Sequence, residues 1–177
     1  MELLDEGRAE EEARARARAR AFDRMAEEGA QLAGTLIDLA ERRSTVALRT
    51  ESGRTHHGVI TAVGADHLRM RADTGSEPLV RLSAIVTVRV RPGERQRPAT
   101  GERSPADHRR LLEALARAVD QRPRATLVVR GGEVLAGRLR AVGDDVVSVD
   151  LDGEDGLGCY VSGPAITEVW LDTSGDA

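Results

Sequence analysis

At 177 residues the chain is long enough for one medium domain or for two small ones, each of which would bury only about 60% of its unfolded surface. All 26 basic residues are arginine, against 30 acidic residues, and only residues 44–104 are basic, with 10 Arg and 6 Asp or Glu. Residues 1–43 (8 against 11) and 105–177 (8 against 13) are acidic, which excludes the pervasive positive field of a general nucleic-acid binder.

The cysteine count and the hydropathy of the sequence limit the cellular environments in which we expect the protein to work. A single cysteine, Cys159, excludes an internal disulfide and a cysteine cluster for structural zinc. The sequence shows no signal-peptide pattern, and no apolar run approaches the roughly 18 residues of a membrane span. We therefore expect a soluble, cytoplasmic protein that does not contact a membrane.

Two helical patterns precede the first expected strand. Residues 1–27 are rich in Glu, Ala and Arg, with acidic residues four positions ahead of arginines, which favours a solvated, ion-paired helical extension over a nucleic-acid-binding arm. From Phe22 onward, apolar residues recur every three or four positions, so that Phe22, Leu32 and Leu36 share one helix face. We interpret this face as a docking surface for a protein partner.

After Ser44 the apolar period changes from helical spacing to two. Five short alternating segments follow, near residues 46–48, 60–62, 68–70, 80–82 and 86–90. Five strands in about 46 residues suggest a small, closed or nearly closed antiparallel barrel.

The same order of helix and strands is then repeated. Residues 91–104 hold two prolines and two glycines and are interpreted as a linker. Ser104 is the predicted N-cap of a second helix, with Pro105 as its first residue and Asp107 in its first turn, and the helix stops before Pro123. Five more strands are expected near 125–130, 134–142, 145–151, 158–162 and 166–171, followed by a disordered tail at 172–177.

The two units are related by an internal duplication. A shift of 79 residues aligns Gly53 with Gly132, Gly58 with Gly137, and the Ala-Val-Gly stretch that ends at Gly64 with the one that ends at Gly143. A shift of 81 aligns Ala84-Ile85 with Ala165-Ile166, so that the second copy has two extra residues near its fourth strand. Matches through helices, turns and strands together indicate a tandem repeat.

Two stretches resemble a known family. Gly132-Glu-Val-Leu-Ala-Gly137 fits the Gly-x-x-Leu-x-Gly opening of the first Sm motif, and Ser83-Ala-Ile-Val-Thr-Val88 is similar to the strand that closes the second motif of bacterial Sm-like proteins. The resemblance to the Sm-like (LSm/Hfq-like) small β-barrel family implies an N-terminal helix followed by a bent five-stranded barrel. The expected fold class is therefore α+β, mostly β, with two tandem Sm-like barrels, each preceded by a helix, at residues 28–90 and 105–171.

The RNA-binding residues of that family are not retained here. The family's Asp, in the turn after the second strand, falls on Gly64 and Gly143, and no Asn follows in either copy. Its late Lys-His or Arg-Gly pair falls on Leu82-Ser83 and Gly163-Pro164. The resemblance therefore supports the fold more than the function.

A second set of candidate residues comes from strand alternation. It places four arginines on the outer face of the first barrel with a histidine beside them, as candidate RNA contacts: Arg49, Arg69, Arg71, Arg89 and His67. The second copy has Val128 and Trp170 at two of these positions, which we interpret as a docking surface for a partner, unless they lie under the helices.

No catalytic, cofactor-binding or metal-binding motif is found in the sequence. We therefore expect a non-enzymatic, homo-oligomerising assembly module that takes no cofactor and no metal and joins its barrels edge to edge. The alternative is a weak RNA-binding protein, riboregulatory or translation-linked, that uses the basic face of the first barrel.

Overall fold

The computed structural model describes residues 11, 14–20, 31–91, 107–153 and 157–172. Residues 14–20 are helical and exposed. The expectations for Phe22, for Ser104 and Pro105, for the tail after Asp172 and for nearly all of the linker lie outside the described residues. Among the residues described, no helix has the length and apolar character of a membrane span.

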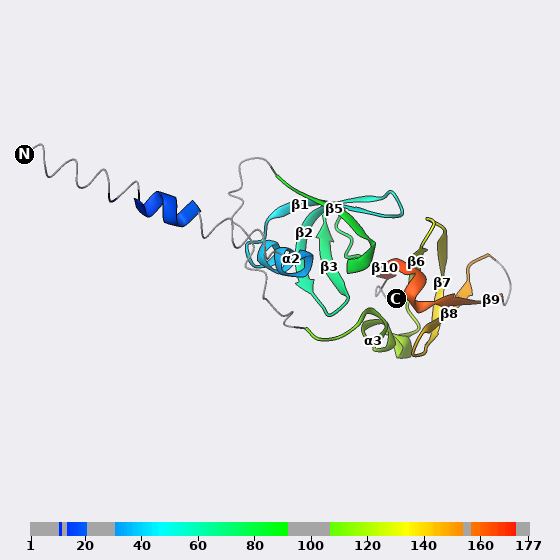
Figure 1. Ribbon diagram of the computed structural model, residues 1–177. Coiled ribbons are helices and arrows are strands. Elements are labelled where there is room, and N and C mark those ends of the chain that lie inside the picture. The colour runs from blue at the N-terminus through cyan, green and yellow to red at the C-terminus, as the bar shows by residue number, and fades with distance from the viewer. Residues whose placement is uncertain (1–10, 12–13, 21–30, 92–106, 154–156, 173–177) are drawn as a thin grey trace, which may run out of the picture.

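Helix α2 (Leu32–Glu41) lies against β2 (Thr55–Val63), where its apolar stripe closes one side of a core (Figure 1). Leu36 and Leu39 are buried there. The helix therefore forms where the sequence predicts one, although its described part begins only at Leu32.

The first half-sheet contains five antiparallel strands in the order β5-β1-β2-β3-β4. In addition to β2 these are β1 (Thr45–Thr50), β3 (His67–Ala72), β4 (Leu79–Arg81) and β5 (Ile85–Val90), with a 3₁₀ turn at Leu82–Ala84 before the last strand. The predicted alternation is confirmed in β1 and β3, but a register shift between Ile60 and Ala62 breaks it in β2, so that Val63 is buried in place of Ala62, and in β5 Ile85 packs on the core while Val86 is exposed. The buried side chains of the core that α2 covers are Val46, Leu48, Ile60, Val63, Leu68, Met70 and Val80.

The second half-sheet repeats this arrangement in the order β10-β6-β7-β8-β9. Its strands are β6 (Arg124–Val129), β7 (Val134–Val142), β8 (Val146–Leu151), β9 (Gly158–Ser162) and β10 (Ile166–Asp172), with 3₁₀ turns at Val119–Gln121 and Gly163–Ala165. It has its own core, to which α3 (Leu111–Ala116) contributes Leu111 and Leu115.

Helix α3 is shorter than the sequence predicts. Residues 107–110 are not helical, so the expected place of Asp107 in the first turn is wrong. The Asp107 carboxylate instead accepts hydrogen bonds from Arg109, and the backbone N–H of Leu111 donates to Asp66 Oδ1, 2.7 Å away in the first half. A carboxylate from the other copy therefore caps this helix.

The expected α+β, mostly β fold class is confirmed, but the two halves are not separate barrels closed by hydrogen bonds, which corrects the expected pair of five-stranded barrels. Strand β4 would have to pair with β5 to close the first half, but it pairs with β10 of the second half instead. The result is one ten-stranded antiparallel sheet with β5 and β9 at its ends, folded around two cores that lie side by side (Figure 1).

The duplication is visible in the backbone. The only two described non-glycine residues with positive φ are Arg43 (52°) and Arg122 (46°), which are 79 positions apart. A Cβ on Gly58 would collide with the carbonyl oxygen of Arg71, and one on Gly137 with that of Asp150, again 79 positions further on. Both glycines are therefore required by the same close approach between the second and third strands of a half.

Candidate functional site

The junction between the half-sheets is built by β4 and β10. Leu79 lies opposite Val169 and Val80 opposite Glu168. Leu79 is 4% exposed and packs into the core of the second half, whereas Val80 belongs to the core of the first. The two cores are therefore connected through a shared pair of strands.

Glu168 is a fully buried carboxylate in this junction. Its Oε1 accepts hydrogen bonds from Thr50 Oγ1 and Ser52 Oγ, both at 2.6 Å, and its Oε2 lies 2.9 Å from His56 Nε2. Burial alone would raise the pKa of this carboxyl, but the hydrogen bonds from His56, Ser52 and Thr50 outweigh it and hold the pKa below its usual value. These three side chains, Thr50, Ser52 and His56, all come from the first half, and because they form the binding site of the Glu168 carboxylate we call them the Glu168 site.

Trp170, two residues along β10, lies on the same face of the strand. Its ring centroid is 5.7 Å from that of His56, and the Arg54 guanidinium lies 5.8 Å from the ring centre. Val128 is the cross-strand partner of Glu168 and is fully buried. Val128 is therefore not available as the expected surface for an external partner, because this face of the second half lies against the first.

A second polar cluster joins the halves around Arg81. This side chain donates to the backbone oxygens of Ile166 (2.7 Å) and Gly163 (2.9 Å), and it forms an ion pair with Asp66 (2.9 Å). In the described part of the chain, no buried side-chain nitrogen or oxygen lacks a hydrogen-bond partner. Both clusters are therefore satisfied from within and serve to fix the two halves together.

The structure gathers the predicted basic residues only in part. Arg49 and Arg89 are exposed on the adjacent strands β1 and β5, while Arg69 and Arg71 are exposed on β3, on the other side of β2. His67 is 6% exposed, contrary to its expected place beside them, and burial lowers its pKa despite a hydrogen bond to Asp66. The expected single cationic face is therefore two separate pairs.

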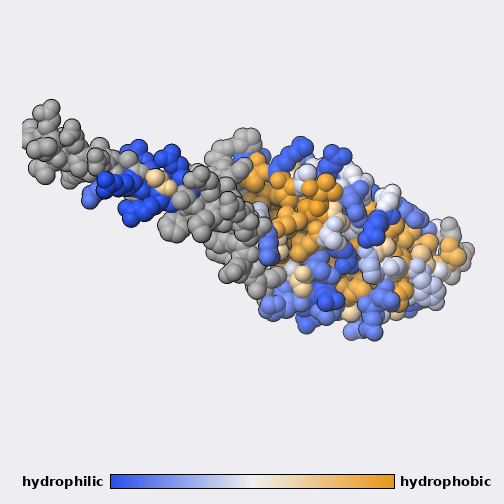
Figure 2. All heavy atoms as spheres, in the orientation of Figure 1, coloured by the Kyte–Doolittle hydropathy of each residue, from blue (hydrophilic) through white to orange (hydrophobic). Residues whose placement is uncertain are grey.

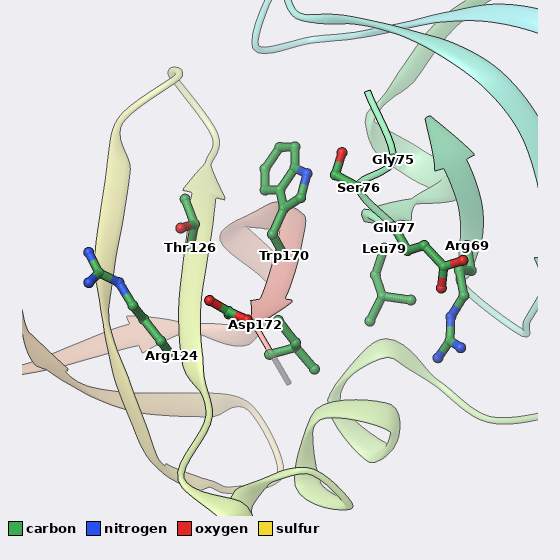
Figure 3. A pocket seen from close by; sticks show the side chains of 10 residues that line it. Arg69, Gly75, Ser76, Glu77, Leu79, Arg124, Thr126, Trp170 and Asp172 are labelled. Atoms are coloured by element: carbon green, nitrogen blue, oxygen red, sulfur yellow. The ribbon is translucent and has the colours of Figure 1, made fainter. Parts of the chain in front are cut away.

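A groove of about 590 Å³ lies beside the junction (Figure 3). Trp170 stands between Arg124 of the second half and Arg69 of the first, but the carboxylates of Glu77 and Asp172 line the same groove. Two charges in this region are already compensated, since Arg124 pairs with Asp152 at 2.7 Å and Glu77 with Arg71 at 3.1 Å. The groove thus combines one aromatic ring with charges of both signs.

The helix face that was predicted to dock a partner is partly buried in the protein's own core and partly exposed. Leu36 is fully buried in the core of the first half and is not free to dock a partner. Leu32 is 46% exposed at the start of α2, whereas its counterpart in the second copy, Leu111, is fully buried at the junction.

The ends of the sheet are two open edges. Among the strands that the structure describes, β5 pairs with β1 alone and β9 with β8 alone. Val86 on β5 is 60% exposed and Tyr160 on β9 is 73% exposed, while their counterparts at the junction, Thr167 and Leu79, are 2% and 4% exposed. Apolar surface accordingly appears over the β1, β2 and β5 region and again towards the β9 end (Figure 2).

Sequence reasoning did not find the Glu168 site. Alternation places Glu168 on the outer face of its strand together with Trp170, where an acidic residue is expected to be solvated. The one available signal was an acidic residue in a strand at a position where the first copy has Thr87. Comparisons with protein-family models, with curated proteins and with solved structures found no match to this chain.

Proposed function

We propose that the chain is a non-enzymatic assembly module of two Sm-like units, which associates with further copies of itself through the free edges of its sheet. The single observation that carries this proposal is the junction between β4 and β10. By the duplication, β9 is the counterpart of β4 and β5 is the counterpart of β10. The chain therefore has, at its two ends, the same two edges that it joins in its middle.

The internal junction supplies a register for this association. Leu79 opposite Val169 translates into Tyr160 opposite Val88 of a second copy, and Val80 opposite Glu168 translates into Val161 opposite Thr87. Leu79 closes the core of the second half, and Tyr160 occupies the equivalent place for the first half of the next copy. Val88, only partly buried in the single chain, would be covered there.

Open strand edges support the same proposal on general grounds. An exposed edge with unpaired backbone groups and apolar side chains is a template for further strands, and proteins that remain single protect it with charge, proline or a covering segment. Among the described residues of β9 there is neither a charged residue nor a proline.

Light scattering on the purified chain tests this proposal. We expect a mass of several chains at tens of micromolar, with a fixed value for a closed ring and a value that rises with concentration for an open filament. A strict monomer at that concentration would contradict the proposal.

RNA binding is a second candidate, favoured by the groove of Figure 3. Single-stranded RNA is held by arginines and aromatic planes, and the structure brings Trp170 of the second half into the groove lined by Arg69 of the first. Replacing Arg69 and Arg71 together should then weaken the binding of short RNAs almost equally for all sequences and reduce its dependence on salt. The absence of binding at low salt would end this candidate.

A further inference from the structure

We infer that the groove of Figure 3 binds an extended, acidic segment of a partner protein, which adds as a short strand to the free end of β10. A segment bound in this way gains affinity from main-chain hydrogen bonds and specificity from its alternating side chains. The groove is separate from the two sheet ends at β5 and β9, so the inference goes beyond the proposed self-association and does not depend on it.

Strand β10 is longer than its neighbour on the side of the groove. It pairs with β6 as far as Asp172, which lies opposite Arg124. On its other side β4 pairs only with Glu168 and Val169. Within the part of the chain that the structure describes, residues 170–172 therefore have a neighbouring strand on one side only.

The groove exists because β4 starts two residues later than its counterpart β9. At the two missing positions the first copy has Glu77 and Pro78, where the second has Gly158 and Cys159. Pro78 has no N–H to donate, and the backbone oxygens of Ser76 and Pro78 accept hydrogen bonds from β3, at 2.8 and 3.2 Å. The chain before β4 thus follows β3 and leaves space beside β10.

The backbone of Leu171 points into this space. The N–H of Val129 donates towards β7, so by alternation the backbone groups of Thr126 point towards β10, where Trp170 lies opposite. The N–H and C=O of Leu171, one residue further along β10, then point away from β6. Among the described residues no backbone hydrogen bond satisfies them on that side, whereas a segment residue opposite Leu171 would satisfy both.

The faces of the sheet fix which side chains the segment would meet. Arg69, Leu79 and Val169 lie opposite one another on β3, β4 and β10 and so share a face, to which Leu171 also belongs. The segment residue opposite Leu171 places its side chain on this face, within reach of the long Arg69 side chain. The segment residues before and after it turn towards Trp170.

The charges around the groove favour an acidic residue at that central position. Arg69 is exposed, and its guanidinium has no ion pair with any residue that the structure describes. Glu77 is already paired with Arg71, at 3.1 Å, and Arg124 with Asp152, at 2.7 Å. A carboxylate on the segment therefore gains a charge-assisted contact with Arg69.

Trp170 supplies a signal that is specific for this groove, because it is the only tryptophan in the chain. The probe is the end-blocked peptide Thr-Val-Asp-Val-Thr, whose valines would face Trp170 when its aspartate lies opposite Leu171. We expect a saturable change in Trp170 fluorescence with a dissociation constant below about 1 mM at low salt. The same peptide with lysine in place of aspartate should bind about tenfold more weakly or worse.

N-methylated peptides test the pairing of the backbone. Methylation of the aspartate nitrogen removes the N–H that faces Leu171 and should abolish binding, whereas methylation of the following valine nitrogen, which faces away from β10, should be tolerated. Equal binding of the two methylated peptides would overturn the inference.

Charge reversal in the protein tests the role of Arg69. We expect Arg69→Glu to raise the dissociation constant of the aspartate peptide by about tenfold or more and to bind the lysine peptide better than the wild-type chain does. Arg49→Glu, exposed on β1 and outside the groove, is the matched control and should change binding by less than about twofold. Circular dichroism of both variants checks that the fold is retained.

The remaining outcomes are distinct from those of the proposed function. A wild-type chain that is monomeric in light scattering contradicts self-association and leaves the fluorescence titration as the test of the groove. No saturable change in Trp170 fluorescence up to millimolar peptide overturns the inference. A change with a short oligouridylate but not with the peptide also overturns it, and assigns the groove to RNA.

Discussion

His56 Nε2 and Glu168 Oε2 lie 2.9 Å apart across the junction of the half-sheets, although 112 positions separate them in the chain. The carboxylate comes from β10, and every side chain that donates to it comes from the first copy of the duplication. The buried carboxylate of Glu168 therefore distinguishes β10, at the internal junction, from β5, at the open edge, where the equivalent residue is Thr87. One pair of edges is joined by a buried carboxylate, and the equivalent pair is left without one.

Removing the Glu168 carboxylate should destabilise the chain. We expect Glu168→Ala to lower the free energy of unfolding by roughly 2–4 kcal/mol, because Thr50, Ser52 and His56 lose their acceptor in a buried site. Thr87→Ala, at the equivalent exposed position, should change it by less than about 0.5 kcal/mol. Urea unfolding at a protein concentration low enough to keep the chain monomeric measures both, and equal effects would contradict the buried role of Glu168.

The burial of His67 predicts a dependence of stability on pH. Burial lowers its pKa from 6.5, against the opposing influence of Asp66 and Asp107, so the unfolded chain binds a proton that the folded chain resists. The stabilisation is complete above pH 6.5 and declines as the pH falls from 6.5 through the lower pKa of the folded state. The urea midpoint should therefore drop between pH 7.5 and 5.5.

The variant His67→Gln isolates this contribution. It cannot take up the proton, so we expect a smaller drop in the urea midpoint over the same interval, whatever its stability at pH 7.5. An equal drop in both proteins would mean that His67 does not cause the dependence.

The strands and the duplication could be predicted from the sequence because they depend on local patterns. Alternation at Val46 and Leu48 and the recurrence of Gly58 as Gly137 report contacts within one half, and both appear in the structure. The start of α3 was not predicted correctly: Glu113 accepts from the N–H of Arg110 locally, but the N–H of Leu111 is capped by Asp66, 45 positions away in the other copy, and a contact of that range leaves no local pattern.

The pairing of strands at the junction could not be predicted from the sequence either. Period-two patterns show which face of a strand is apolar, but they do not show which edge joins which. The burial of Val128 and Glu168 follows from the pairing of β4 with β10, and so does the failure of each half to close into a barrel. His67, predicted to be outside, is buried beside Asp66, which joins the two halves through Arg81 and Leu111.

Leu79 and Tyr160 are duplicates with different surroundings, and they should respond differently to truncation. Leu79→Ala removes a side chain from the core of the second half and should cost about 2–5 kcal/mol of unfolding free energy. Tyr160→Ala, at a 73% exposed position, should leave the stability of the single chain nearly unchanged but weaken self-association. Denaturant unfolding and light scattering on both variants check this, and an unaltered mass for Tyr160→Ala would count against β9 as an interface.

Disulfide trapping between two differently tagged chains tests the central claim, which is that β9 of one copy pairs with β5 of another. In a Cys159→Ser background, one chain carries Tyr160→Cys and the other Val88→Cys. Residues directly opposite in antiparallel strands have Cα atoms about 4.5–5.5 Å apart, within the range that a disulfide spans. Thr61→Cys, exposed on β2 with both edges of its strand paired, replaces Val88→Cys in the control. The proposed pairing predicts a mixed disulfide between the two chains that the control does not form, whereas only homodisulfides, or none, would contradict it.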